Sequence, residues 1–177
     1  MSAETLHVVC QHLANDDRET ARELLVQHYP FVPVAKKARR YTDLQSARIF
    51  ARDGFIDRYS GERLVYPGAL RALSLIFPDE FPHHPNWAMD RTHRAFWKLF
   101  PTIDHVVPFA RGGADDETND ATTSMMRNQI KAHWRLEEIG WSLHPPGARL
   151  AWDGLMGWFI DYVAKYPDLL ETPYIRR

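Results

Sequence analysis

Residues 101–131 constrain the fold of this chain more than any other segment. They begin with apolar and β-branched residues from Thr102 to Val107, which are typical of a β-strand. Arg111-Gly112-Gly113 and the acidic residues after it indicate a loop, and residues 121–123 can return as a second strand. We therefore expect a pair of strands joined by a long loop.

A helix is expected directly after the second strand. Ser124 is a residue type that caps helix N-termini, and Gly140 is one that ends helices. These two residues predict a helix from Ser124 to about Glu138. The predicted order is strand, loop, strand, helix, which places the chain in the mixed α+β class.

The first predicted strand contains two adjacent polar residues, Asp104 and His105, in otherwise apolar surroundings. Burying such groups without partners costs stability. A hard divalent cation could be one partner, because carboxylate and amide oxygens suit Mg²⁺ or Mn²⁺. Asp104 from the strand and Asn128 from the helix could each supply one oxygen ligand. Neighbouring strand residues point to opposite faces, so Asp104 can face a metal while His105 faces an attacking water.

The same segment resembles the HNH endonuclease family, whose core is a ββα-metal finger. The matching elements occur in order, with 14 residues from His105 to Asn119 and 9 residues from Asn119 to Asn128. The match comprises Asp104-His105-Val106-Val107-Pro108, Gly112-Gly113, Asn119 and Asn128-Gln129-Ile130-Lys131.

The resemblance implies a role for each matched polar residue. His105 would be the general base that deprotonates water for attack on a phosphodiester. Asp104 and Asn128 would hold one divalent ion, with Mg²⁺ or Mn²⁺ favoured and other transition metals allowed. Asn119 would brace the loop and thereby orient His105. The products would carry 5′-phosphate and 3′-hydroxyl ends.

Two groups of basic residues are expected to contact nucleic acid. Arg111 and Lys131 lie within the motif. A second group precedes it, in a segment from Lys36 to Arg63 that has eight basic and four acidic residues. A solvated helix face explains such a segment as well as a phosphate-binding face does. The residues of this second group that we expect to bind phosphate are Lys36, Lys37, Arg39 and Arg40.

The chain has one cysteine, Cys10, which excludes a disulfide framework and a zinc site built on paired cysteines. Many members of the HNH family carry two Cys-x-x-Cys pairs that bind a structural zinc ion. Other residues occupy the corresponding positions here, in residues 57–60 and 124–127. We therefore expect no structural zinc, and we expect packing to hold the finger instead.

Three regions are expected along the chain. Residues 1–35 form an N-terminal helical extension, with helices over 4–13 and 16–29. Residues 36–141 form the nuclease core, with the motif at 101–135. Residues 142–177 form an aromatic-rich helical segment packed on that core. The expected fold is α+β, with a ββα-metal finger embedded in an α-rich single domain.

Net charge and hydropathy narrow the function classes. A formal net charge of −1 excludes a globally basic nucleic-acid coat, although it allows a local basic surface. No secretory signal and no apolar stretch of about 20 residues is evident, which predicts a cytoplasmic protein without a membrane partner.

The sequence thus predicts an enzyme, a metal-dependent endonuclease that hydrolyses phosphodiester bonds in nucleic acid, with DNA favoured over RNA. The alternative is a non-catalytic nucleic-acid-binding module that keeps the HNH frame. A single site cuts one strand, so cleavage of both strands would need a homodimer or repeated nicking.

Overall fold

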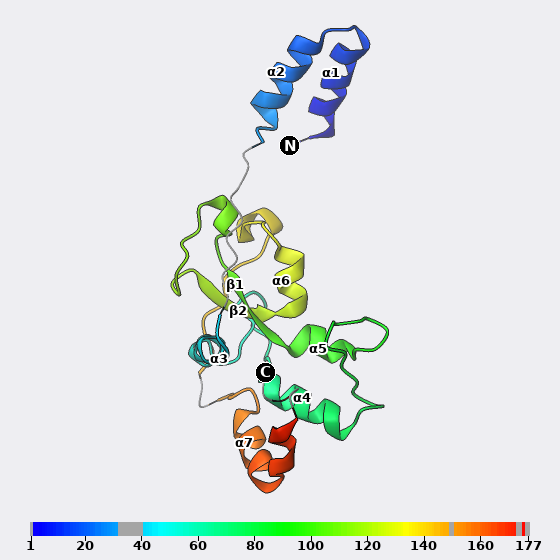
Figure 1. Cartoon of the computed structure of the whole chain (residues 1–177). Helices are drawn as coiled ribbons and strands as arrows, with labels where there is room; N and C mark the ends of the chain where they lie inside the picture. Colours follow the sequence, from blue (N-terminus) through cyan, green and yellow to red (C-terminus); the bar gives the residue numbers. More distant parts are fainter. Residues whose placement is uncertain (1, 32–40, 149–150, 173–174, 176–177) are drawn as a thin grey trace. The chain divides into compact units, whose positions relative to one another are not determined.

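The computed structural model divides the chain into two compact units, Met1–Ala38 and Arg39–Arg177. The first is a helical hairpin, and the second contains the sheet and the remaining helices (Figure 1). The structure describes residues 2–31, 41–148, 151–172 and 175.

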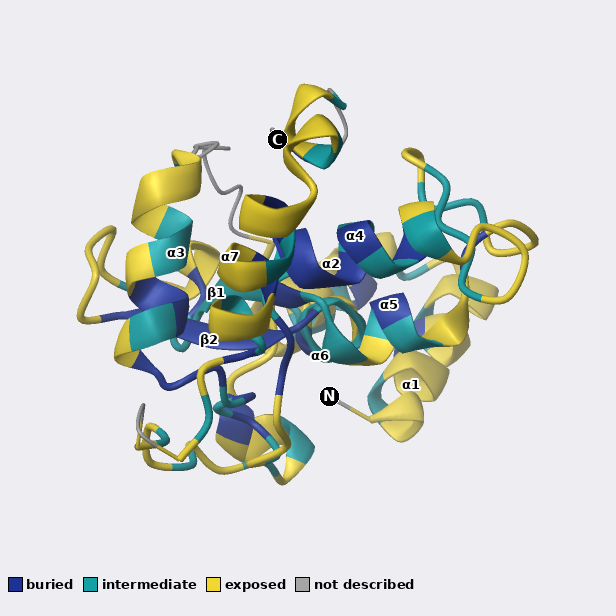
Figure 2. Ribbon diagram, turned by 90° about the horizontal axis from the view of Figure 1, so that it is seen from below, coloured by how far each residue is buried: buried dark blue, intermediate teal, exposed yellow. Residues whose placement is uncertain are grey.

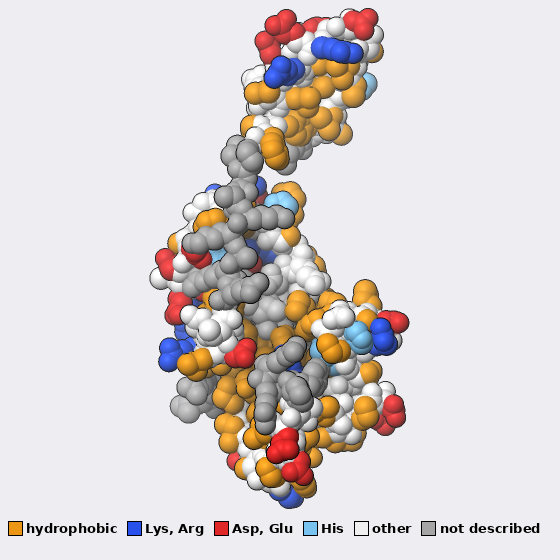
Figure 3. Space-filling view, in the orientation of Figure 1, with side chains coloured by type: hydrophobic (Ala, Val, Ile, Leu, Met, Phe, Trp, Pro, Cys, Tyr) orange, Lys and Arg blue, Asp and Glu red, His pale blue; other side chains and the backbone are white. Residues whose placement is uncertain are grey.

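The first unit consists of α1 (Ala3–Ala14) and α2 (Arg18–His28), which pack against each other. Both helices begin at a side-chain cap: Ser2 accepts a hydrogen bond from the backbone of Thr5, and Asp17 accepts one from the backbone of Thr20. Both predicted helices are present. Hydrophobic side chains gather on one face of this hairpin (Figure 3). The exposed large hydrophobic residues of the hairpin are Leu6, Val8, Leu13, Leu25, Val26 and Phe31.

The second unit is built around a two-stranded antiparallel sheet, β1 (Pro101–His105) and β2 (Asp120–Ser124). The register pairs Thr102 with Thr123 and His105 with Asp120. The mixed α+β class is therefore confirmed.

Two helices cover the sheet, α3 (Asp43–Arg52) on one face and α6 (Met125–Lys131) on the other (Figure 2). The Thr122 hydroxyl donates to the carbonyl of Ile49 in α3. On the other side, Asn128 of α6 donates to the Thr102 hydroxyl. One face of this small sheet therefore packs on α3, and the other face packs on α6.

Helix α6 is shorter than the sequence predicts. Ser124 caps it as expected, but it ends at Lys131 rather than near Glu138. Ala132 has a φ of 47°, a left-handed value that interrupts the helix. The turn brings Leu136 into a buried cluster with Tyr59 and Ala121, in the short 3₁₀ helix η2 (Leu136–Ile139). The prediction failed because burying Leu136 stabilises the fold more than extending the helix to Glu138 would.

The main core lies where α4 (Pro67–Ile76), α5 (Arg94–Leu99) and α7 (Met156–Lys165) meet. Its buried residues are Val65, Ala69, Leu70, Ala72, Phe96, Phe159, Val163 and Ile175. Short 3₁₀ helices, η1 (Phe109–Arg111) and η3 (Pro167–Glu171), complete the elements. Within the part of the chain that the structure describes, no helix has the length and apolar character needed to cross a bilayer.

Candidate active site at the end of β1

Asp104 lies on the face of β1 that α6 covers. Its Oδ2 accepts hydrogen bonds from the Tyr59 hydroxyl and the Lys131 ammonium, each at 2.7 Å. Burial and the charge of Asp104 raise the pKa of Tyr59, so the phenol stays protonated and remains a donor. Two donors thus fix the position of one carboxylate oxygen.

Asn128 lies in the first turns of α6, close to the same strand. Its Nδ2 donates to the Thr102 hydroxyl at 3.1 Å and to the carbonyl of Ile103 at 3.3 Å. These contacts bring Asn128 beside the residue that precedes Asp104. Because the amide nitrogen makes both contacts, the carbonyl oxygen of Asn128 is the atom suited to bind a cation.

His105 is the last residue of β1 and lies on the opposite face, beside Asp120. Its Nε2 is buried and lies 3.8 Å from Asp120 Oδ1. The Tyr41 hydroxyl donates to that same oxygen at 2.7 Å. Sequence reasoning missed Tyr41 and Asp120, although the strand register alone would have placed Asp120 opposite His105.

Asn119 connects the two ends of the loop between the strands. Its Oδ1 accepts from the Val107 amide at 2.9 Å, and its Nδ2 donates to the carbonyls of Val107 and Ala114. Gly113 lies so close that a Cβ there would be 1.9 Å from the Val107 oxygen. Asn119 therefore holds the backbone two residues after His105, and only glycine fits at 113.

The two basic residues of the motif bind protein groups. Lys131 is fully buried, and its ammonium donates to the His105 carbonyl at 2.7 Å as well as to Asp104. Arg111 pairs with Glu138 and is partly exposed. Lys131 thus neutralises Asp104 inside the protein, whereas Arg111 lies at the surface, where a phosphate could approach.

The second basic group is only partly described. Lys36, Lys37, Arg39 and Arg40 lie outside the described residues. Further along, Arg52 and Arg58 both bind the buried carboxylate of Asp53, each at 3.0 Å. These two arginines therefore belong to an internal ion-pair network.

Asp53 also joins α3 to the sheet. Its Oδ2 accepts a hydrogen bond from the Thr122 amide at 2.8 Å. Burial alone would raise the pKa of Asp53, but hydrogen bonds from Arg52 and Thr122 outweigh it and hold the pKa below its ordinary value.

Asp57 and Ser124, two of the positions that align with zinc ligands of the HNH family, are buried. Asp57 is fully buried, and its carboxylate accepts from the Tyr59 amide, the Thr123 hydroxyl and the Ser124 amide, each at 2.9 Å. Arg127 Nε lies 3.6 Å from the same carboxylate. Hydrogen bonds, besides the packing that the sequence led us to expect, therefore connect this turn to β2 and α6.

Asp104 and Asn128 come from β1 and α6, which contact each other. Asp104 and Asn128 offer oxygen atoms from adjacent elements, which suits a hard divalent ion that keeps water and binds a phosphate. Within the described ranges, no group of three or more His, Cys, Asp or Glu residues is placed to hold a metal. Lys131 supplies the charge that balances Asp104.

No family model, curated protein or solved structure matches this chain. The functional argument therefore depends on the residues and their geometry.

Proposed function

We propose that the second unit is a metal-dependent endonuclease with an HNH-type ββα-metal site, acting on nucleic acid and preferentially on DNA. The observation that carries the proposal is that Asn128 of α6 lies against β1, the strand that carries Asp104 and His105. Asn128 is 24 residues from Asp104 in the chain, yet its side chain contacts the residue preceding Asp104.

The chain's own groups divide the work of hydrolysis. Asp104 and Asn128 would hold the divalent ion, which would polarise the scissile phosphate and stabilise the leaving 3′-oxygen. His105 would take a proton from water as the water oxygen bonds to phosphorus and the bond to the 3′-oxygen breaks. Asn119 would keep the backbone after His105 in place.

The test is nicking of supercoiled plasmid by the purified protein with Mg²⁺ or Mn²⁺. His105→Ala and Asp104→Ala should each reduce the rate at least about 100-fold, the usual minimum contribution of a general base. His133→Ala is the matched control and should nick like the wild type, because His133 is exposed and its ring stacks on Trp134. Absence of metal-dependent cleavage of DNA or RNA, or equal cleavage by His105→Ala, would exclude the enzyme.

One contact favours the alternative, a non-catalytic nucleic-acid-binding module. The Lys131 ammonium gives Asp104 a counter-charge without any metal. Calorimetric titration of Mn²⁺ into the wild type and Asp104→Ala separates the two. The enzyme requires weaker metal binding in the variant, whereas equal heats would show that Asp104 is no ligand.

A further inference from the structure

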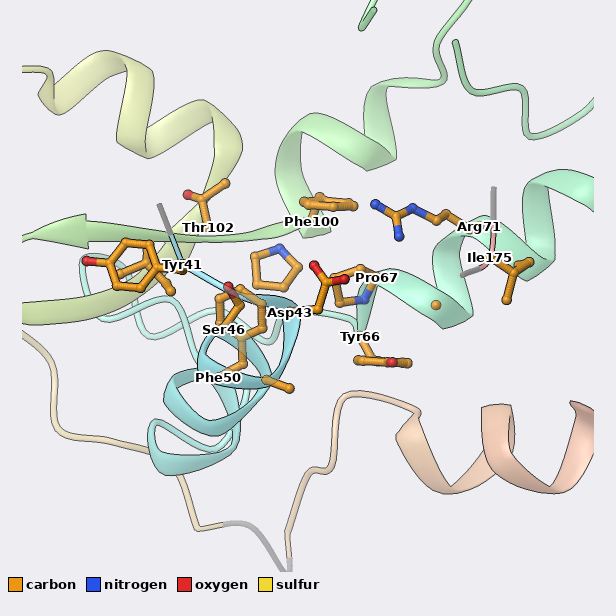
Figure 4. Close-up of a pocket in the computed structure, with 14 residues that line it drawn as sticks. Tyr41, Asp43, Ser46, Phe50, Tyr66, Pro67, Arg71, Phe100, Thr102 and Ile175 are labelled. Atoms are coloured by element: carbon orange, nitrogen blue, oxygen red, sulfur yellow. The ribbon is translucent and has the colours of Figure 1, made fainter. Parts of the chain in front are cut away.

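A cavity of about 450 Å³ lies between α3, α4 and the start of β1, outside the residues assigned to catalysis (Figure 4). Tyr41, Asp43 and Ser46 line one side of it, and Tyr66, Arg71 and Phe100 line the other. This volume is within the usual range for small-ligand sites. It can hold one nucleotide-sized group.

The lining combines aromatic faces with one cation and one anion. The Arg71 guanidinium lies 5.7 Å from the ring centre of Phe100. Burial raises the pKa of Tyr66, so its ring enters the wall as a neutral phenol. Aromatic faces stack on nucleobases, and arginine binds phosphate through several of its five N–H donors.

Asp43 adds a directional acceptor to this lining. It is exposed at the first position of α3, and its carboxylate is directed toward the centre of the cavity (Figure 4). Carboxylates accept hydrogen bonds from the amino and imino groups of bases. A nucleotide matches all three kinds of lining group. Its planar base stacks on the aromatic rings, the N–H groups of the base donate to Asp43, and its phosphate binds Arg71.

The cavity adjoins the candidate active site through Tyr41. Tyr41 lines the cavity and donates its hydroxyl to Asp120, whose Oδ1 lies 3.8 Å from His105 Nε2. Only one carboxylate therefore separates the cavity wall from the expected general base. A nucleotide in the cavity would be a close neighbour, along the strand, of a phosphate at His105.

We propose that this cavity binds the base of an unpaired nucleotide next to the phosphodiester that is cleaved. This inference rests on the proposed function, because it assumes that a phosphodiester is cleaved beside the bound base. The binding test does not require cleavage. A base in a duplex is paired and stacked, so it can enter only from a single strand or after flipping out. The favoured substrate is therefore single-stranded DNA, or a duplex with an unpaired base at the cut.

Binding is measured in EDTA, so that no cleavage occurs. The probe is an eight-nucleotide single-stranded DNA carrying one 2-aminopurine, whose fluorescence reports stacking, with the same strand in a duplex for comparison. Ser46→Phe fills the cavity from α3, and Arg71→Gln removes the cation. Leu44→Phe is the matched control, because Leu44 lies on the same helix and is 63% exposed.

We expect the single strand to bind at least tenfold more tightly than the duplex. We also expect Ser46→Phe and Arg71→Gln to weaken single-strand binding about tenfold, while Leu44→Phe leaves it unchanged. Thermal melting of each variant confirms that it is folded. If the wild type does not bind the single strand, or if both cavity variants bind it like the wild type, the inference is overturned.

The same variants separate this inference from the proposed function. Loss of single-strand binding in Ser46→Phe, together with no metal-dependent cleavage of plasmid, single-stranded DNA or RNA by the wild type, would support the cavity and exclude the enzyme. Plasmid nicking by the wild type, together with unchanged single-strand binding in both cavity variants, would support the enzyme and overturn the cavity.

Discussion

Asp104 illustrates how a single charged residue is stabilised in this fold. Its carboxylate contacts a phenol from the turn before the sheet and an ammonium from the helix after it. Partners of a metal ligand tune its orientation and charge, and their loss usually costs 10–100-fold in metal affinity or activity. Tyr59 and Lys131 are such partners if Asp104 binds a metal.

Tyr59→Phe should lower metal-dependent nicking about tenfold while leaving the ring packing intact, because only the hydrogen bond to Asp104 is lost. The measurement is the plasmid nicking rate as a function of Mn²⁺ concentration. Tyr166→Phe removes a hydroxyl from an exposed ring and should change nothing. An unaltered Mn²⁺ dependence in Tyr59→Phe would show that this hydrogen bond does not position a ligand.

Tyr59 and Lys131 contact Asp104, and in the same way Asp120 is the carboxylate that lies beside His105. It lies opposite His105 in the sheet, and its Oδ1 is 3.8 Å from Nε2. A carboxylate beside a catalytic imidazole holds the ring in one orientation and stabilises the protonated form. Asp120→Asn keeps the shape but removes the charge.

We expect Asp120→Asn to reduce the maximum nicking rate by about tenfold or more with little change in the substrate concentration at half-maximal rate. Single-turnover kinetics on plasmid measure both quantities. Asp116→Asn, in the loop before β2, is the control and should leave the rate unchanged. A wild-type maximum rate in Asp120→Asn would mean that His105 does not depend on this carboxylate.

At the scale of elements, Asp57 is the residue that joins the turn at 57–61 to the β2–α6 junction. Its carboxylate accepts hydrogen bonds from the Thr123 hydroxyl and the Ser124 amide. Ser124 also caps α6, so the strand end and the helix start depend on the same junction. The buried carboxylate of Asp57 therefore ties the turn to the β2–α6 junction through hydrogen bonds.

Asp57→Ala should lower the free energy of unfolding by about 3 kcal/mol or more, because it leaves buried donors and Arg127 without their acceptor. Glu62→Ala removes the exposed partner of Arg127 and should cost less than about 1 kcal/mol. Urea unfolding followed by circular dichroism compares the two variants. Equal losses in both would contradict a special role for the buried carboxylate.

At the scale of the whole molecule, we expect acid stability to depend on His83, a half-buried histidine. His83 packs on Phe96 with ring centres 4.3 Å apart. Burial, assisted by the charges of Arg71 and His84, lowers its pKa from 6.5 to about 4. The folded protein therefore resists a protonation that the unfolded chain accepts.

The direction of this pH effect follows from the linkage between protonation of His83 and folding. The depressed pKa leaves stability intact above about pH 6.5 and reduces it progressively as the pH falls toward 4. His83→Phe should remove much of this dependence, because phenylalanine cannot be protonated. Thermal melting between pH 4 and 7.5 measures the effect. Parallel pH curves for the wild type and His83→Phe would exclude His83 as the group responsible.

The distribution of charge also becomes clear only for the whole molecule. The segment from Lys36 to Arg63 carries a net +4 by sequence, against −1 for the chain. In the structure, Arg52 and Arg58 are committed to Asp53. A sum of charges along the sequence therefore overstates the basic surface, because it does not distinguish internal pairs from solvated groups.

The sequence by itself determined the local elements and the expected chemistry at the end of β1. Strand, loop, strand and helix follow from residue types within one segment of about 30 residues, whereas the candidate roles of His105, Asn119 and Asn128 are what the resemblance to the HNH family implies. Such features depend on short-range periodicity, capping and turn preferences, which neighbouring residues specify. The predicted helix from Ser124 to about Glu138 instead ends at Lys131, after which Leu136 enters a buried cluster.

Only the tertiary structure decided which distant residues support that site. Tyr59 reaches Asp104 across 45 positions of the chain, and Tyr41 reaches Asp120 across 79. No local pattern encodes such pairs, because they arise when α3, the turn at 57–61 and α6 pack on a common sheet. The same packing buried Lys131 and formed the cavity between α3, α4 and the start of β1.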